Sequence, residues 1–128
     1  MIIEKLSPWE FDKTVELLLV EAAKLSWNIP AVHDLRQSLA KAGKSVAPVK
    51  VIEICKPEYS GKMLEKNDER IISVMMPCRI SVYLKEDGNT YIALINVADL
   101  VTNMPETIRA VMLAVAEEIN GIIESVIG

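Results

Sequence analysis

The chain has 128 residues with a formal net charge of −4, and 51% of its residues are apolar. This length and apolar content suffice for one domain with its own core, without disulfide or metal staples. The pI of about 5.0 argues against a nucleic-acid-binding protein and against attachment to anionic membranes. No apolar stretch reaches the ~18 residues that span a bilayer, and the first residues do not resemble a signal peptide. We therefore expect a cytoplasmic protein, one domain over residues 1–128, with two reduced cysteines.

The beginning of the chain predicts a helix over residues 8–25. Ser7 has the position of an N-cap, Pro8 that of the first helical residue and Glu10 that of a capping-box glutamate. Apolar residues then recur at helical spacing, namely Phe11, Val15, Leu18, Leu19 and Ala22. Ile2 and Ile3 precede this helix and are compatible with a short strand.

The middle of the chain predicts short elements: an edge strand or extended loop over 27–32, a helix over 35–42, a strand over 49–54 and a helix from Pro57. Pro30 cannot donate to a central ladder, which places its strand at an edge. Asp34 is an N-cap for the helix that follows, and Gly43 ends that helix as its C′ residue.

Two alternating apolar runs, residues 79–85 and 90–97, predict a β-hairpin because Asp87-Gly88 separates them. A two-residue turn there would place Ile80, Val82 and Leu84 opposite Ile95, Ala93 and Tyr91, and this face would be wholly apolar. The opposite face would be amphipathic and would suit a partner surface or a ligand floor. It would carry Arg79, Ser81, Tyr83, Ile92, Leu94 and Asn96.

The last predicted element is a long helix over residues 105–126 that covers the sheet. Its apolar stripe consists of Ile108, Val111, Met112, Val115, Ile119, Ile122 and Val126. Several acidic side chains are expected on solvated helix faces: Asp12, Glu16, Glu117, Glu118 and Glu124. Together these elements predict an α+β fold, a small sheet containing antiparallel strands with helices packed on one face.

At residues 51–59 (VIEICKPEY) and 76–83 (MPCRISVY) the chain resembles the domain-of-unknown-function family 302. The resemblance extends from the first helix to the last. It implies a compact α+β domain that tends to form dimers, and it implies no reaction. Lys56 stands where that family often has an asparagine N-cap.

Cys55 and Cys78 are the residues on which a specific chemistry can be based. Cys55 follows a strand and directly precedes the helix that begins at Pro57, so the helix dipole and Lys56 both favour a thiolate there. Cys78 lies at the start of the hairpin, and strand ends in a small sheet can meet. The pair is therefore either a dithiol for redox or sulfur chemistry, or two small buried apolar groups.

A soft-metal site is the related alternative. Met76 and Cys78 offer a thioether and a thiol within three residues, and with Cys55 they would suit Cu(I). Methionine is also a common filler of cores. Two cysteines without a Cys-x-x-Cys motif, and a single distant histidine, do not make a zinc site.

Polar candidates are few. Arg79 and Tyr83 share one face of a strand, where with Ser81 and Asn96 they would bind a small anion, or where Arg79 would pair with a glutamate across a dimer interface. His33 is expected to be a loop histidine without a catalytic role. No Ser-His-Asp arrangement, P-loop or dinucleotide-binding motif occurs, so the sequence assigns no catalytic residue.

Two functional hypotheses follow. The first is a non-enzymatic homodimer that binds a small-molecule ligand or a partner, with Arg79 and Tyr83 as candidate ligand residues. The second is a thiol-based redox, sulfur-handling or Cu(I)-binding protein that uses Cys55 and Cys78. Whether the chain is an enzyme stays open at this stage.

Overall fold

The computed structural model describes residues 1–65 and 67–128 and contains one antiparallel sheet. Its strands are β1 (Ile2–Ser7), β2 (Asn28–Asp34), β3 (Val49–Cys55), β4 (Cys78–Leu84) and β5 (Thr90–Ile95). Their order across the sheet is β1-β5-β4-β3-β2. The strand that contains Pro30 is thus an edge strand, as predicted.

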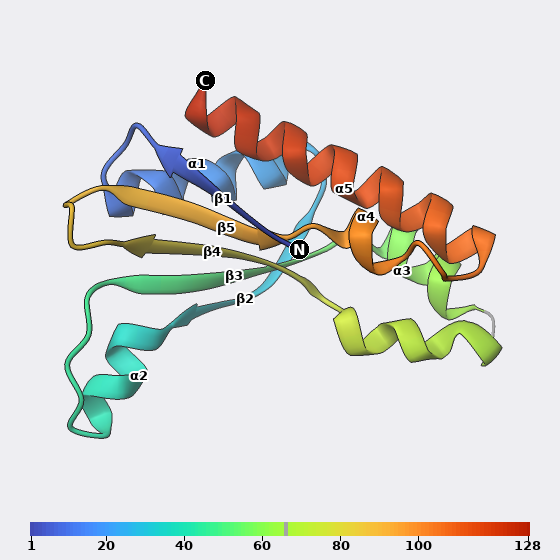
Figure 1. Ribbon diagram of the computed structural model, residues 1–128, viewed down its shortest axis with the longest axis horizontal. Coiled ribbons are helices and arrows are strands. Elements are labelled where there is room, and N and C mark those ends of the chain that lie inside the picture. Colours follow the sequence, from blue (N-terminus) through green and yellow to red (C-terminus); the bar gives the residue numbers. More distant parts are fainter. Residues whose placement is uncertain (66) are drawn as a thin grey trace.

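The helical segments are α1 (Phe11–Lys24), α2 (Leu35–Lys41), α3 (Pro57–Leu64), the 3₁₀ segment η1 (Asn67–Met75), α4 (Val97–Leu100) and α5 (Glu106–Ile127). In Figure 1, α1 passes behind the strands, and α5, which packs against α1, runs along the top of the view. The fold is therefore α+β with a long C-terminal helix, as predicted. Among the described residues, no helix is both long and apolar enough to cross a bilayer.

The core lies between the sheet and helices α1 and α5. Alternate residues of the central strands, such as Ile52, Ile80 and Ile92, are almost completely buried there. Every member of the predicted stripe on α5 is buried as well. This burial of one helix stripe against one sheet face is the main apolar contribution to stability. Among the described residues, no helix lies over the other face of the sheet in Figure 1.

The predicted start of the first helix is wrong. Ser7 belongs to β1, where it pairs with Thr90, and the helix begins only at Phe11, with Glu10 as an N-cap that forms no side-chain capping bond. The Ser7 hydroxyl instead accepts from the Trp9 N–H at 3.1 Å and is 2.7 Å from the Thr14 hydroxyl. Strand pairing at this sheet edge thus outweighs the local capping pattern.

The predicted hairpin register is wrong by one residue. Leu84 pairs with Thr90, Tyr83 with Tyr91 and Ser81 with Ala93. The loop holds three residues rather than two, because the Gly88 N–H donates to the Lys85 carbonyl at 3.0 Å and Gly88 takes a positive φ of 82°. This is the common turn that ends in a bulge at a left-handed glycine. As a result, Tyr91, Ala93 and Ile95 face the uncovered side of the sheet.

Candidate functional site

A cavity of ligand size lies where β4 and β5 part. Their pairing stops at Ser81 and Ala93, although β4 begins at Cys78 and β5 extends to Ile95. A cleft of about 400 Å³ opens between the two strands. Its walls come from the sheet, from η1, from α4 and from α5, and most of the lining side chains are apolar: Ile2, Ile3, Val51, Val74, Met75, Pro77, Ala93, Leu94, Ile95, Val97, Leu100, Ala116 and Ile119.

Part of the cleft lining, including Ala93 and Ile95, lies on the uncovered face of the sheet. Two apolar side chains at its rim are well exposed, Ile2 at 72% and Ile95 at 50%. Exposed aliphatic groups beside an apolar cleft extend the surface from which a ligand can displace water. The site therefore combines a buried floor with an accessible apolar rim.

A few polar groups also line the cleft, namely Arg79, Ser81, Asn96 and Asn120. The Arg79 side chain is 57% exposed, and its Nε lies 3.8 Å from a Glu53 carboxylate oxygen. That carboxylate is also 3.0 Å from Nε2 of His33. The Glu53 side chain is only 15% exposed, so this contact joins a mostly buried carboxylate to a guanidinium that is more than half exposed.

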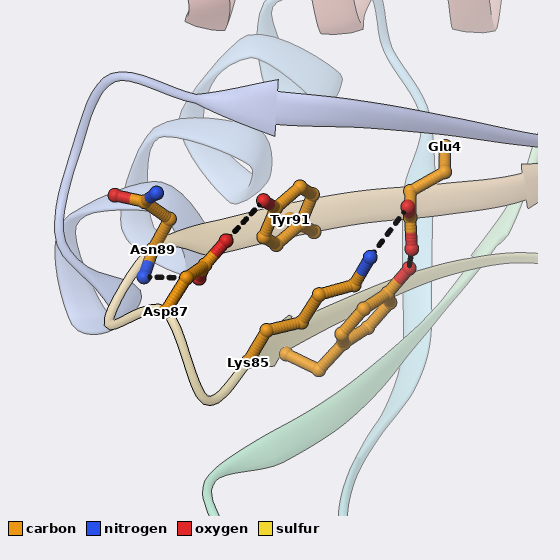
Figure 2. Close-up of polar contacts among 6 residues, drawn as sticks. Glu4, Lys85, Asp87, Asn89 and Tyr91 are labelled. Atoms are coloured by element: carbon orange, nitrogen blue, oxygen red, sulfur yellow. Dashed lines mark hydrogen bonds and ion pairs between the residues drawn. The ribbon is translucent and has the colours of Figure 1, made fainter.

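Tyr83, the other predicted ligand residue on β4, lies outside this cleft. It is near the hairpin loop, where its hydroxyl donates to Glu4 and its ring stacks against Tyr91 with centroids 6.2 Å apart. Figure 2 shows this network: the Lys85 ammonium donates to Glu4 at 2.8 Å, and the Tyr91 hydroxyl donates to Asp87 at 2.6 Å. The structure thus separates Arg79 from Tyr83, and only Arg79 remains a ligand candidate in the cleft.

The two cysteines meet at a second, much smaller cavity of about 20 Å³. Cys78 pairs with Ile54, the neighbour of Cys55, so the ends of β3 and β4 bring both residues to this cavity. Met76, the predicted third sulfur ligand, lines it as well. All three predicted sulfur residues therefore share one site. Cys78 also lines the larger cleft, so its side chain lies between the two cavities.

The environment of the two thiols differs. Burial, with a smaller contribution from the nearby Cys55, raises the pKa of the Cys78 thiol from about 9 to about 11. Cys78 is therefore almost fully protonated at neutral pH. The Cys55 sulfur lies 3.7 Å from the Ser60 hydroxyl, within hydrogen-bonding range for sulfur. As whole residues, both cysteines are of intermediate burial.

A polar cluster beside the small cavity was not predicted, because Glu118 was expected on a solvated face. Its carboxylate accepts hydrogen bonds from Trp27 Nε1 at 3.2 Å, from Lys56 Nζ at 2.9 Å and from the Tyr59 hydroxyl. Burial alone would raise the pKa of Glu118, but these three donors outweigh it and lower that pKa below its usual value. The donors come from distant parts of the chain, and no local pattern indicates their convergence.

Lys56 takes part in this cluster rather than acting on Cys55 alone. Besides its bond to Glu118, its ammonium lies 5.9 Å from the Trp27 ring centroid and 5.5 Å from that of Tyr59. These contacts hold one positive charge at the edge of the small cavity.

The fold and the cleft define a class of small α+β domain: an antiparallel sheet covered on one face, with a ligand-sized cavity where two central strands part. A model of the family described as "Domain of unknown function DUF302" matches residues 3–126, and the chain belongs to this family. It is similar to a crystal structure of an uncharacterized conserved DUF302 protein from Bacillus stearothermophilus, with a TM-score of 0.86 and 16% identity over 98% of this chain and 97% of that chain. No curated protein matches this sequence. This likeness supports the fold, and only the cavities bear on the function.

Proposed function

We propose that this protein is a non-enzymatic binding domain whose cleft between β4 and β5 takes a small, largely apolar molecule with one anionic or polar group. The supporting observation is the cleft itself. Its volume of about 400 Å³ lies within the range of small-molecule sites, and its lining is apolar apart from a few polar groups. Arg79 at the cleft would receive the anionic end, with Ser81 and Asn96 as further hydrogen-bonding groups.

The proposal predicts how affinity depends on ligand length. Each methylene group that moves from water into the cleft contributes about 0.8 kcal/mol. This corresponds to an approximately fourfold lower dissociation constant per added carbon. The gain should stop when the chain fills the cleft. A homologous series of straight-chain carboxylates, measured by isothermal titration calorimetry, is therefore the test.

Two paired variants locate the binding. Ala116 lines the cleft from α5, so Ala116→Leu should reduce its volume and weaken decanoate binding at least tenfold. Ala110 is exposed on the same helix and does not line the cleft, so Ala110→Leu is the matched control. Unchanged binding by Ala116→Leu, or no saturable binding of any carboxylate in the series, would contradict the proposal.

The anionic head group is tested separately. Arg79→Gln keeps a long polar side chain but removes the charge. Decanoate should bind the variant about tenfold more weakly, whereas decanol should bind both proteins equally, because only the carboxylate uses the guanidinium. If Arg79→Gln weakens the binding of decanol and decanoate equally, Arg79 contributes packing and not charge.

We further propose that the domain is a homodimer that joins two uncovered sheet faces. This face carries the exposed Leu6 and, beside it, Tyr91, Ala93 and Ile95. A sheet face without helical cover is a common association surface, and this one mixes apolar side chains with charged ones such as Glu4 and Arg79. Light scattering of the wild-type protein should give twice the monomer mass. Leu6→Lys should lower the measured mass toward that of the monomer. Leu113→Lys, on the exposed side of α5, is the control and should leave the mass unchanged. A monomer mass at micromolar concentrations would refute the dimer.

A thiol-based redox or sulfur-handling role is the second candidate, supported by the shared cavity of Cys55 and Cys78. With diamide as the oxidant, a functional pair would lose two hydrogens and form one intramolecular disulfide, visible as a mass decrease. The Cys55→Ser and Cys78→Ser variants each keep one thiol per chain and would form no intramolecular disulfide. Absence of a disulfide in the native wild-type protein would exclude this role.

A further inference from the structure

The small cavity gathers five of the eight sulfur-containing side chains of this chain. Cys55 comes from the end of β3, Cys78 from the start of β4 and Met76 from the segment before it. Two further thioethers, which sequence reasoning did not single out, belong to Met63 on α3 and Met112 on α5. Four separate parts of the chain thus contribute sulfur to one place.

The size of this cavity limits what it can hold. About 20 Å³ is close to the space that a single water molecule requires, which is too little for an organic ligand but enough for one ion. Residues 1–65 and 67–128 contain no cluster of three or more histidine, cysteine, aspartate or glutamate side chains suited to a metal ion. The site therefore has too few cysteine, histidine or carboxylate ligands for a structural zinc, magnesium or calcium site, and its sulfur atoms are the donors that soft cations prefer.

We propose that this cavity is a binding site for one Cu(I) ion, held by the thiolates of Cys55 and Cys78 with methionine thioethers as additional donors. Cu(I) forms two sulfur–metal bonds with the cysteines as each thiol releases one proton to solvent, and no electron is transferred. The bis-thiolate complex carries one negative charge. Lys56, whose ammonium lines the same cavity, provides a neighbouring positive charge.

The packing around the cavity supports a preformed site. The side chains of Met63 and Met112 are only 3% and 1% exposed, so their thioethers are held in place by the core. The two cysteines are of intermediate burial, less enclosed than the two methionines, so an incoming ion would approach from their side of the cavity. The Ser60 hydroxyl beside Cys55 can donate to the thiolate once the proton has left.

The test is an anaerobic titration of the reduced protein with Cu(I) in competition with the chromogenic chelator bicinchoninate. We expect one Cu(I) per chain, and sulfur as the only first-shell donor in X-ray absorption spectra of the wild-type complex. Failure of the protein to remove copper from bicinchoninate, or oxygen and nitrogen donors in the first shell, would overturn the proposal. The spectra need no variant, so a misfolded mutant cannot obscure the result.

Variants then assign the donors. Cys55→Ser and Cys78→Ser should each abolish competition with the chelator. Met76→Leu should weaken Cu(I) binding about tenfold or more. Substitutions of residues that only contact a metal ligand already cause losses of this size at metal sites. Met75→Leu is the matched control, because Met75 lines the large cleft and not the small cavity. Equal effects of Met75→Leu and Met76→Leu, or wild-type binding by both cysteine variants, would contradict the assignment.

Discussion

The high pKa of Cys78 makes a quantitative prediction about thiol reactivity. Burial raises this pKa from about 9 to about 11. At any pH below 9, the thiolate fraction of Cys78 is therefore about 100-fold lower than that of an ordinary cysteine. Since the thiolate is the nucleophile, Cys78 should react with Ellman's reagent about 100-fold more slowly than a model thiol near pH 8.

The assay uses the Cys55→Ser variant, in which Cys78 is the only thiol. Removing Cys55 eliminates the smaller of the two causes of the shift and leaves burial in place. The reaction rate should rise about tenfold per pH unit and should level off only near pH 11. A plateau near pH 9 would show that the thiol is solvated in the native protein, and the reasoning from burial would then be refuted.

The same shift affects stability, with a definite sign. Because the folded-state pKa lies above the unfolded one, the protonated thiol favours the folded state. This contribution is fully present below pH 9 and is lost as the pH rises through 11, by up to about 3 kcal/mol. Urea denaturation of Cys55→Ser should show this loss relative to a Cys55→Ser, Cys78→Ala double variant. Parallel pH profiles of the two proteins would contradict the prediction.

Three further predictions concern other parts of the fold. The hydrogen bond to Glu118 is the main cause that raises the pKa of Tyr59 to about 12. Glu118→Gln should therefore lower this pKa toward 10 in a spectrophotometric titration of tyrosinate. An unchanged titration would argue against that bond. Asp34→Ala removes the side-chain acceptor of the Gln37 N–H at 2.9 Å and should cost about 1 kcal/mol in chemical denaturation, with Asp34→Asn restoring most of it. Gly88→Ala forces a side chain into a positive φ of 82° and should destabilise the protein by about 1–2 kcal/mol, and a neutral effect on the melting temperature would refute the bulged turn.

The elements with strong local signals were predicted correctly. The stripe on α5 is long enough that its period alone defines a buried face, and all of its members are buried. Asp34 caps α2 through the Gln37 N–H, and Gly43 has a positive φ of 78° just after that helix, as the sequence indicated. In each case the deciding interactions lie within a few residues of one another.

The errors occurred where distant segments decide local structure. Ser7 has the local features of a helix cap, but its backbone pairs with Thr90, more than eighty residues away. The hairpin register depended on one extra loop residue at Gly88, which moved Tyr91 and Ala93 to the uncovered face. The sequence pattern was equally consistent with a two-residue and a three-residue loop, so it could not determine the register of the hairpin.

The candidate sites were predicted in part. The sequence analysis allowed two strand ends to meet, and Cys55, Met76 and Cys78 do line one cavity, but the pairing of β3 with β4 was not predicted. The large cleft was not predicted, because it exists only where β4 and β5 part and where α4 and α5 close the space behind them. Glu118 was missed for a related reason, since its three donors come from other elements of the fold.

The most direct test of the proposed function is a titration of isotope-labelled protein with decanoate, followed by amide chemical shifts. Ser81, Ala93 and Ala116 line the cleft from three different elements. If decanoate binds there, the chemical shifts of their amides should change together and saturate with one dissociation constant. Shifts confined to segments away from the cleft, such as α2, or the absence of saturation at millimolar decanoate, would contradict it.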